Sequence, residues 1–230
     1  MALIQSTAIP SSGATDYELD QSLRFEDGVS HYLKRTNTSG GNRRTWTWSG
    51  WIKRGNVNIS HTVFFANYYD GGNRGYLSFN SSNQIYVYDT ATDYEGYTTA
   101  VFRDPNAWYQ FVIVMDSTES AESDRFKVYV NGVRQTWNWT HALNSNEEGN
   151  FNRVNYPHII SSANGGSNEP FDGYLAEVHF IDGTALTPSS FGETGDYGEW
   201  KPIEVSGLTY GTNGFYLPFK QDYTVEGFSA

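Results

Sequence analysis

The hydrophobic and polar positions along the chain follow the pattern of β-strands. In residues 44–54, RTWTWSGWIKR, alternate positions place Trp46, Trp48, Gly50 and Ile52 on one face of a strand. Similar short segments predict strands at 22–25, 44–54, 62–69, 75–79, 84–89, 108–116, 125–135, 157–164, 171–183 and 214–219. Because segments with the helical period of 3.6 are nearly absent, we expect under about 10% helix.

Turn signals between these segments predict that the strands are antiparallel. Asn131-Gly132 lies between valines, and this pair favours a type I′ hairpin turn, in which both central residues need a positive φ. Residues 80–83 and 70–72 predict two further turns. About ten strands with turns every 8–12 residues are typical of a β-sandwich. We therefore predict an all-β fold, a two-sheet antiparallel jelly roll.

The alternation also predicts which side chains form the core and how the domain closes. Strands 22–25 and 214–219 are expected to lie near each other. The residues expected to face the core are Trp46, Trp48, Ile52, Val112, Val114, Phe126, Val128 and Val130.

Three regions are predicted along the chain: an extended N-terminal arm (1–21), the jelly-roll domain (22–220) and a C-terminal tail (221–230). The arm carries no side-chain charge before Asp16 and has too little apolar mass for a core of its own. We expect it to anchor the chain by adding to a sheet edge of another copy or of another protein. The opening residues lack the basic and apolar regions of a signal peptide.

Composition excludes several classes of function. The net charge is −11, with only 15 scattered Lys and Arg residues, so neither nucleic acid nor an anionic membrane is an expected partner. The sequence has no apolar run long enough to insert into a membrane, and it has no cysteine, which excludes disulfides. Aromatic residues make up 17% of the chain, with 17 Tyr, 14 Phe and 7 Trp.

Residues 171–183 bring three ionisable groups together: Glu177, His179 and Asp182. Alternation places Glu177 and His179 on one face with Leu175 and Ile181, so we interpret them as the polar, half-exposed face of a structural strand. The sequence contains no G-x-S-x-G, H-E-x-x-H, G-x-x-x-x-G-K or dinucleotide-binding motif. No catalytic residue is predicted, and we expect the protein not to be an enzyme.

Several strands in their order resemble the laminin G/pentraxin-like branch of the concanavalin A-like lectin/glucanase superfamily. The resemblance rests on TWTWSGWIKR, WYQFVIVMD, FKVYVNGV and FDGYLAEVHFIDGTAL, and covers about residues 20–220. It implies a jelly roll, and glucanases of the superfamily carry an E-x-D-x-x-E strand motif. That motif is absent here, because Glu122-Ser123-Asp124 is followed by Lys127 at the sixth position and Glu18-Leu19-Asp20 by Leu23.

Many relatives bind calcium at the rim of the sandwich, so the turn acids Asp70, Asp89, Asp93 and Asp172 are candidates for a Ca²⁺ site. They do not form a spaced ligand set such as D-x-D-x-D. We interpret them as turn formers, and expect no metal or other cofactor.

Glycan binding by such a fold relies on exposed aromatic rings with polar neighbours, and two segments fit this description. The first holds Trp137, Trp139 and His141; the second holds Tyr68, Tyr69, Asp70, Asn73 and Arg74. For each ring the alternative is packing in the core.

The two ends of the sequence are similar to virion-associated proteins of tailed phages that infect marine bacteria. The similar segments are MALIQSTAIPSSGATDYELDQSLRF and FGETGDYGEWKPIEVSGLTYGTNGFYLPF. This resemblance implies a protein of the virion surface, in a fibre, tail or capsid decoration, that attaches to host surface polysaccharide. Its expected partners are other virion proteins and other copies of itself. A purely structural component and a polysaccharide depolymerase remain the alternatives.

Overall fold

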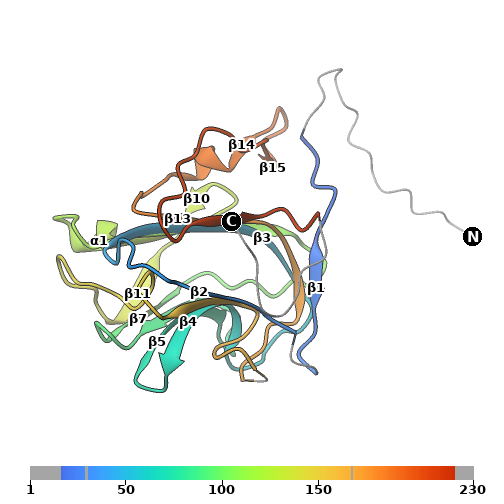
Figure 1. Ribbon diagram of the computed structural model, residues 1–230. Coiled ribbons are helices and arrows are strands. Elements are labelled where there is room, and N and C mark those ends of the chain that lie inside the picture. Colours follow the sequence, from blue (N-terminus) through green and yellow to red (C-terminus); the bar gives the residue numbers. More distant parts are fainter. Residues whose placement is uncertain (1–16, 29–30, 167, 221–230) are drawn as a thin grey trace, which may run out of the picture.

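Two antiparallel sheets lie face to face across an aromatic core in the computed structural model, which describes residues 17–28, 31–166 and 168–220 (Figure 1). Sheet A follows the order β1-β13-β3-β8-β9-β10, and β16 also pairs with β13. Its strands are β1 (Leu23–Phe25), β13 (Gly173–Asp182), β3 (Thr45–Arg54), β8 (Tyr109–Asp116), β9 (Phe126–Val130), β10 (Val133–Arg134) and β16 (Phe215–Leu217).

Sheet B follows the order β11-β7-β6-β5-β4-β12-β2, and a short ribbon pairs two further strands. The strands of sheet B are β11 (Trp137–His141), β7 (Tyr94–Thr98), β6 (Ile85–Asp89), β5 (Asn73–Phe79), β4 (Thr62–Asp70), β12 (Pro157–Ile160) and β2 (Leu33–Thr36); the ribbon joins β14 (Gly192–Thr194) to β15 (Trp200–Pro202). The only helices among the described residues are α1 (Glu122–Arg125) and the 3₁₀ turn η1 (Pro188–Ser190). The predicted all-β antiparallel sandwich, with very little helix, is confirmed.

The structure has more strands in its described part than the ten expected, because several short strands carry a weak alternation signal. They are β2, β7, β11, β14 and β15. The Asn131-Gly132 hairpin is confirmed: both residues have positive φ, 48° and 78°, and they join β9 to β10. β1 and β16 both pair with β13, so the expected proximity of the first and last strands is confirmed.

The core between the sheets contains Trp46, Trp48 and Ile52, as the alternation of β3 predicts. For β8 the prediction was wrong. Val112 and Val114 lie on the outer face of sheet A, and the alternate residues Phe111, Ile113 and Met115 face the core.

Val112 and Val114 are nevertheless buried, because the chain after β13 returns over the outer face of sheet A. Figure 1 shows this segment, with β14 and β15, on the side of sheet A away from sheet B. A strand buried on both faces has no polar alternation to reveal which face is the core.

A β-bulge in β13 changes which residues share a face. The register with β3 shifts between Ala176 and His179, and Glu177 adopts a φ of +47°, in the left-handed region that is uncommon for residues other than glycine. As a result Leu175 and Val178 both enter the core. The predicted face containing Leu175, Glu177, His179 and Ile181 is therefore wrong for Leu175.

Most of the predicted N-terminal arm, residues 1–16, and the whole predicted tail, residues 221–230, lie outside the described residues. Residues 17–22 are described and form no strand or helix. No helix in the described ranges is long and apolar enough to cross a membrane.

Candidate functional site

The outer face of sheet B presents a row of side chains that crosses five strands. In antiparallel strands, residues directly opposite each other point to the same face of the sheet. The register between successive strands connects Ala66, Tyr76, Tyr88, Glu95 and His141 in this order, on β4, β5, β6, β7 and β11.

A second row runs parallel to the first, through Ser78, Tyr86, Tyr97 and Asn138. Together the two rows contain four tyrosines, Tyr76, Tyr86, Tyr88 and Tyr97, which we call the tyrosine face. Tyr86, Tyr88 and Tyr97 are half-buried, whereas Tyr76 is only 7% exposed. The face therefore offers three partly accessible rings, and the buried Tyr76 ring contacts two of them, Tyr86 and Tyr88.

Ring contacts hold the tyrosine face in place. The Tyr76 ring centroid lies 5.6 Å from that of Tyr88 and 6.1 Å from that of Tyr86. The His61 ring meets Tyr86 edge-on at 4.9 Å. Tilted and edge-on pairs at these distances are favourable aromatic contacts, so the rings form a supported platform.

Charged groups surround these rings. The Arg74 guanidinium lies 5.9 Å from the centre of the Tyr88 ring, and His141 Nδ1 lies 3.9 Å from Glu95 Oε2. Burial and a hydrogen bond with Glu95 raise the pKa of Tyr86, and burial raises the pKa of Tyr76 to about 12. Both phenols therefore stay neutral near pH 7 and keep their hydroxyl protons for hydrogen bonding.

Three of the residues proposed from the sequence belong to this face. Tyr68 is half-buried in the same aromatic cluster as Tyr76, and it lies opposite Arg74 across β4 and β5. Arg74 and His141 flank the tyrosines as described above. The structure thus brings together residues from both proposed segments, although they are far apart in sequence.

Three others lie at the turn between β4 and β5. Tyr69 is 58% exposed and stacks on Tyr156 at 4.9 Å. The Asp70 carboxylate accepts hydrogen bonds from the Gly72 backbone N–H and the Asn73 amide, both at 2.9 Å. The Asn73 and Gly72 bonds lower the pKa of Asp70. Asp70 and Asn73 thus stabilise their own turn, and Tyr69 is the exposed ring there.

Trp137 and Trp139 lie on the inner face of β11, where both pack against the core. The Trp137 ring centroid is 5.0 Å from that of Phe126, and Trp139 meets Tyr94 edge-on at 6.4 Å. Both are half-buried. Their position matches the packing alternative, because they close the edge of the sandwich instead of joining the tyrosine face.

Sequence reasoning missed Tyr76, Tyr86, Tyr88, Glu95 and Tyr97 as functional candidates. The signal was available for three of them, because Tyr76, Tyr86 and Tyr88 occupy alternate positions in two strands that the sequence predicted. The hairpin at 80–83 aligns Tyr76 with Tyr88.

The cluster in β13 is not a half-exposed polar face, as predicted from the sequence. Glu177, His179 and Asp182 are all buried, with 6%, 1% and 7% exposure. The returning C-terminal segment covers Glu177 and His179. Tyr216 donates a hydrogen bond to Glu177 Oε2 at 2.5 Å, and Tyr210 Oη lies 2.8 Å from His179 Nδ1.

Asp182 connects three chain segments. Its carboxylate accepts hydrogen bonds from the Asn42 and Asn213 backbone N–H groups, at 2.7 and 3.0 Å, and from the Asn152 amide at 3.1 Å. These partners give Asp182 a structural role in holding loops together at one end of the sandwich.

The calcium candidates are separated from one another in the fold. The described residues contain no group of three or more His, Cys, Asp or Glu side chains placed to hold a metal ion. Asp172 pairs with Arg24 at 2.5 Å, and Asp93 adopts a φ of 53° between β6 and β7.

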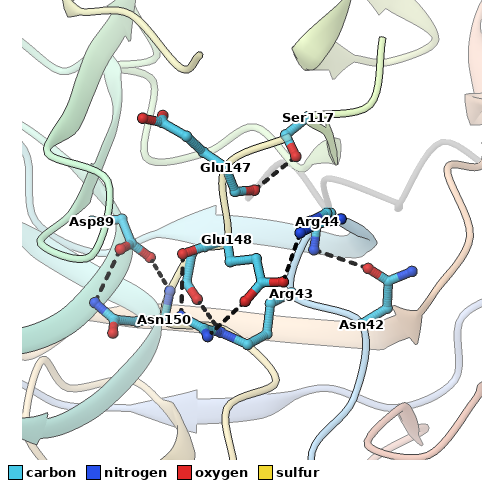
Figure 2. Close-up of polar contacts among 9 residues, drawn as sticks. Asn42, Arg43, Arg44, Asp89, Ser117, Glu147, Glu148 and Asn150 are labelled. Carbon is cyan, nitrogen blue, oxygen red and sulfur yellow. Dashed lines mark hydrogen bonds and ion pairs between the residues drawn. The ribbon is translucent and has the colours of Figure 1, made fainter. Parts of the chain in front are cut away.

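Asp89 is fully buried and holds the loop that follows β11. It accepts hydrogen bonds from the Asn150 backbone N–H (2.8 Å), the Asn150 amide (3.0 Å) and the Ala91 backbone N–H (2.8 Å). Figure 2 shows this contact beside a second one, in which Arg43 and Arg44 pair with Glu148 at 3.0 Å. Burial raises the pKa of Asp89 to about 7.

Comparison with known proteins agrees with this architecture. A family model described as the concanavalin A-like lectin/glucanases superfamily matches residues 27–190. The chain belongs to this superfamily. No curated protein sequence matches it.

Solved structures share the fold at low sequence identity. A native heptameric SAP-like pentraxin from Limulus polyphemus is 13% identical, with a TM-score of 0.52 over 74% of this chain and 80% of that chain. Domains LG4-5 of the mouse laminin α1 chain are 7% identical, with a TM-score of 0.50 over 89% of this chain and 49% of that chain. The lectin-like domain type expected from the sequence is thus confirmed.

Proposed function

We propose that this lectin-like domain binds glycan on the tyrosine face and has no enzymatic activity. In this proposal the domain is part of a surface protein of a tailed-phage virion, in a fibre, a tail or a capsid decoration. Its ligand is a polysaccharide of the host cell surface, and its other partners are virion proteins, including copies of itself.

The observation that carries the proposal is the two-row arrangement of half-buried tyrosines with charged neighbours. An exposed ring face is complementary to the C–H-bearing face of a sugar ring, and the rings here are held by their own contacts before any ligand arrives. Arg74, Glu95 and His141 add hydrogen-bonding groups at the edge of the rings. A few well-placed polar groups beside an apolar surface are typical of ligand sites.

Two features of the sequence support the remaining parts of the proposal. The resemblance of the segments at both ends to phage virion proteins supports location on a particle. The lack of the E-x-D-x-x-E motif supports a binding role over hydrolysis, since glycoside hydrolysis requires a pair of carboxylates at a defined separation.

A glycan array of bacterial surface polysaccharides tests the binding proposal, with the purified domain and its Tyr88→Ala variant. Loss of one stacking ring is expected to weaken binding about tenfold, by analogy with base stacking on aromatic residues. Tyr197→Ala is the matched control, because Tyr197 is 80% exposed and lies outside the tyrosine face. Thermal melting must show that both variants are folded.

Each alternative function has its own outcome. If the domain binds no glycan but still incorporates into particles, it is a purely structural component. Release of reducing ends from host polysaccharide would identify a depolymerase and contradict the non-enzymatic proposal. If Tyr88→Ala binds as tightly as the unmodified domain, the glycan site lies elsewhere on the molecule.

A further inference from the structure

The outer face of sheet A carries a row of four side chains in which cations alternate with aromatic rings. Register places Arg24 opposite Tyr174, and Tyr174 opposite Lys53, on β1, β13 and β3. Tyr109, the first residue of β8, lies opposite Ile52 on β3. Trp108 comes directly before Tyr109 and Lys53 directly after Ile52, so in this antiparallel pair Trp108 lies beside Lys53. We call Arg24, Tyr174, Lys53 and Trp108 the cationic row.

Both rings of the cationic row are accessible. Trp108 is 37% exposed and Tyr174 is 38% exposed. Their centroids lie 6.3 Å apart, although β3 separates their strands, which at the usual spacing stand about 9.6 Å apart. The two rings therefore incline toward each other above β3 and form a tilted aromatic pair, with 58° between the ring planes.

Among the described residues, the chain that covers the outer face of sheet A ends beside this row. The neighbouring row on the same face contains Trp51 and Gln110, which line a pocket with Pro202 and Ile203 from the C-terminal segment. Trp51 is 7% exposed, in contrast to Tyr174 and Trp108. The C-terminal segment thus covers the neighbouring row but leaves the rings of the cationic row exposed to solvent.

The charges of the row differ from those of the whole chain. Among the described residues Lys53 has no ion-pair partner, and the Arg24 guanidinium lies 5.3 Å from the centre of the Tyr174 ring. Arg24 also pairs with Asp172, so the unpaired positive charge of the row is that of Lys53. In a chain of net charge −11, a free cation between two exposed rings is a local feature that selects for an anion.

We propose that the cationic row is a second glycan site, which binds an acidic sugar such as a uronic acid. Trp108 and Tyr174 contact the face of the sugar ring, and the Lys53 ammonium pairs with its carboxylate. A stable protein interface buries about 800 Å² on each partner, far more than four side chains present. A small anionic ring fits the size of the row better.

This site does not depend on the tyrosine face, because the two lie on opposite outer surfaces of the sandwich. An experiment can therefore separate them. The probe is a hexamer of galacturonic acid, and its fully methyl-esterified form is the neutral control with the same sugar rings. Binding is measured by calorimetry with the purified domain in a Tyr88→Ala background, which removes a ring of the tyrosine face.

The acidic hexamer is expected to bind about tenfold more tightly than the ester at low salt, and this preference should shrink as salt screens the charge. Lys53→Gln should abolish the preference, whereas Trp108→Ala should weaken both ligands and Trp108→Phe should restore much of the binding. Lys34→Gln, on β2 of the other sheet, is the matched control and should keep the preference.

Equal binding of acid and ester would overturn the proposal, as would an unchanged preference in Lys53→Gln. If neither hexamer binds, the proposal for the cationic row is overturned too. That result does not test the tyrosine face, which is assayed separately with Tyr88 intact. Self-association that Trp108→Ala abolishes, in the absence of glycan binding, would assign the row to contacts between copies of the chain.

Discussion

His158 is expected to make the folded protein sensitive to acid. It lies on β12 with no solvent exposure, and its ring centroid is 4.7 Å from that of Phe180 and 5.4 Å from that of Phe65. Nε2 lies 3.4 Å from the Asn152 backbone N and from the Asn37 amide. Burial, with a smaller effect of the Arg35 charge, lowers the pKa of His158 to about 3.

The sign of the effect follows from the two protonation states. The unfolded chain has the ordinary His pKa of 6.5, so between pH 6.5 and 3 the unfolded state binds a proton that folded His158 does not bind. The contribution of neutral His158 to the free energy of unfolding is therefore fully present above pH 6.5 and decreases as the pH falls. The slope is about 1.4 kcal/mol per pH unit, so acidification to pH 4.5 costs about 3 kcal/mol.

Other buried groups titrate in the same pH range, so the pH dependence of stability of the unmodified protein alone does not isolate His158. A variant that lacks His158 does isolate it. Burial also lowers the pKa of His179, which adds to the acid sensitivity, whereas the raised pKa of Asp89 opposes it. Comparing a His158 variant with the unmodified protein at each pH cancels both contributions.

The assay is urea unfolding at pH 7 and pH 4.5 for the unmodified protein and His158→Gln. Glutamine keeps a hydrogen-bond acceptor but does not titrate, so the stability lost between the two pH values should be about 3 kcal/mol smaller in the variant. His158→Asn is the second variant if Gln packs poorly, and exposed His141→Gln is the control that should not change the difference. If His158→Gln and the unmodified protein lose the same stability between pH 7 and pH 4.5, His158 is not held neutral in the folded protein.

Three further expectations can be checked by denaturant unfolding. The raised pKa of Asp89 gives a contribution to the free energy of unfolding that is fully present below pH 3.8 and is lost as the pH rises through about 7. Asp89→Asn lacks this pH-dependent contribution, so it should become more stable relative to the unmodified protein as the pH rises from 4 to 7. A stability difference between the two proteins that stays constant over this range would contradict the prediction. Asp182→Ala should lower the free energy of unfolding by about 3 kcal/mol, because it leaves two backbone N–H groups and one amide without their acceptor. Asp182→Asn should cost less, and equal losses would count against the hydrogen-bond explanation. Trp139→Ala should lower the free energy of unfolding by about 2 kcal/mol, since the ring is half-buried against the core, and a fully stable variant would show that the ring is dispensable for packing.

The candidate site shows where sequence reasoning succeeds and where it stops. Tyr68, Arg74 and His141 were selected as chemistry-bearing residues near turns, and the structure places them around one face of sheet B. The sequence left open whether Trp137 and Trp139 turn inward, because β11 is an edge strand and its alternation fits either face. Only its register with β7 settles that these rings oppose Thr98 and Gly96 on the inner side.

Local sequence determined the features that depend on near neighbours. Asn131 and Gly132 tolerate positive φ, so their turn forms wherever the flanking strands can pair. The alternation in β3 separates its two faces, and the large rings Trp46 and Trp48 mark the inner one.

Tertiary structure decided which faces are covered and what each buried group meets. Period-2 alternation assigns side chains to two faces but does not say which face another segment will cover. Val112 and Val114 are buried outside the sandwich because residues beyond β13 return over sheet A, and that same return buries Glu177 and His179. The bulge at Glu177 lets Leu175 and Val178 both face the core, a choice set by pairing with β3 and β16. These outcomes depend on contacts between residues far apart in the chain, and no local pattern encodes them.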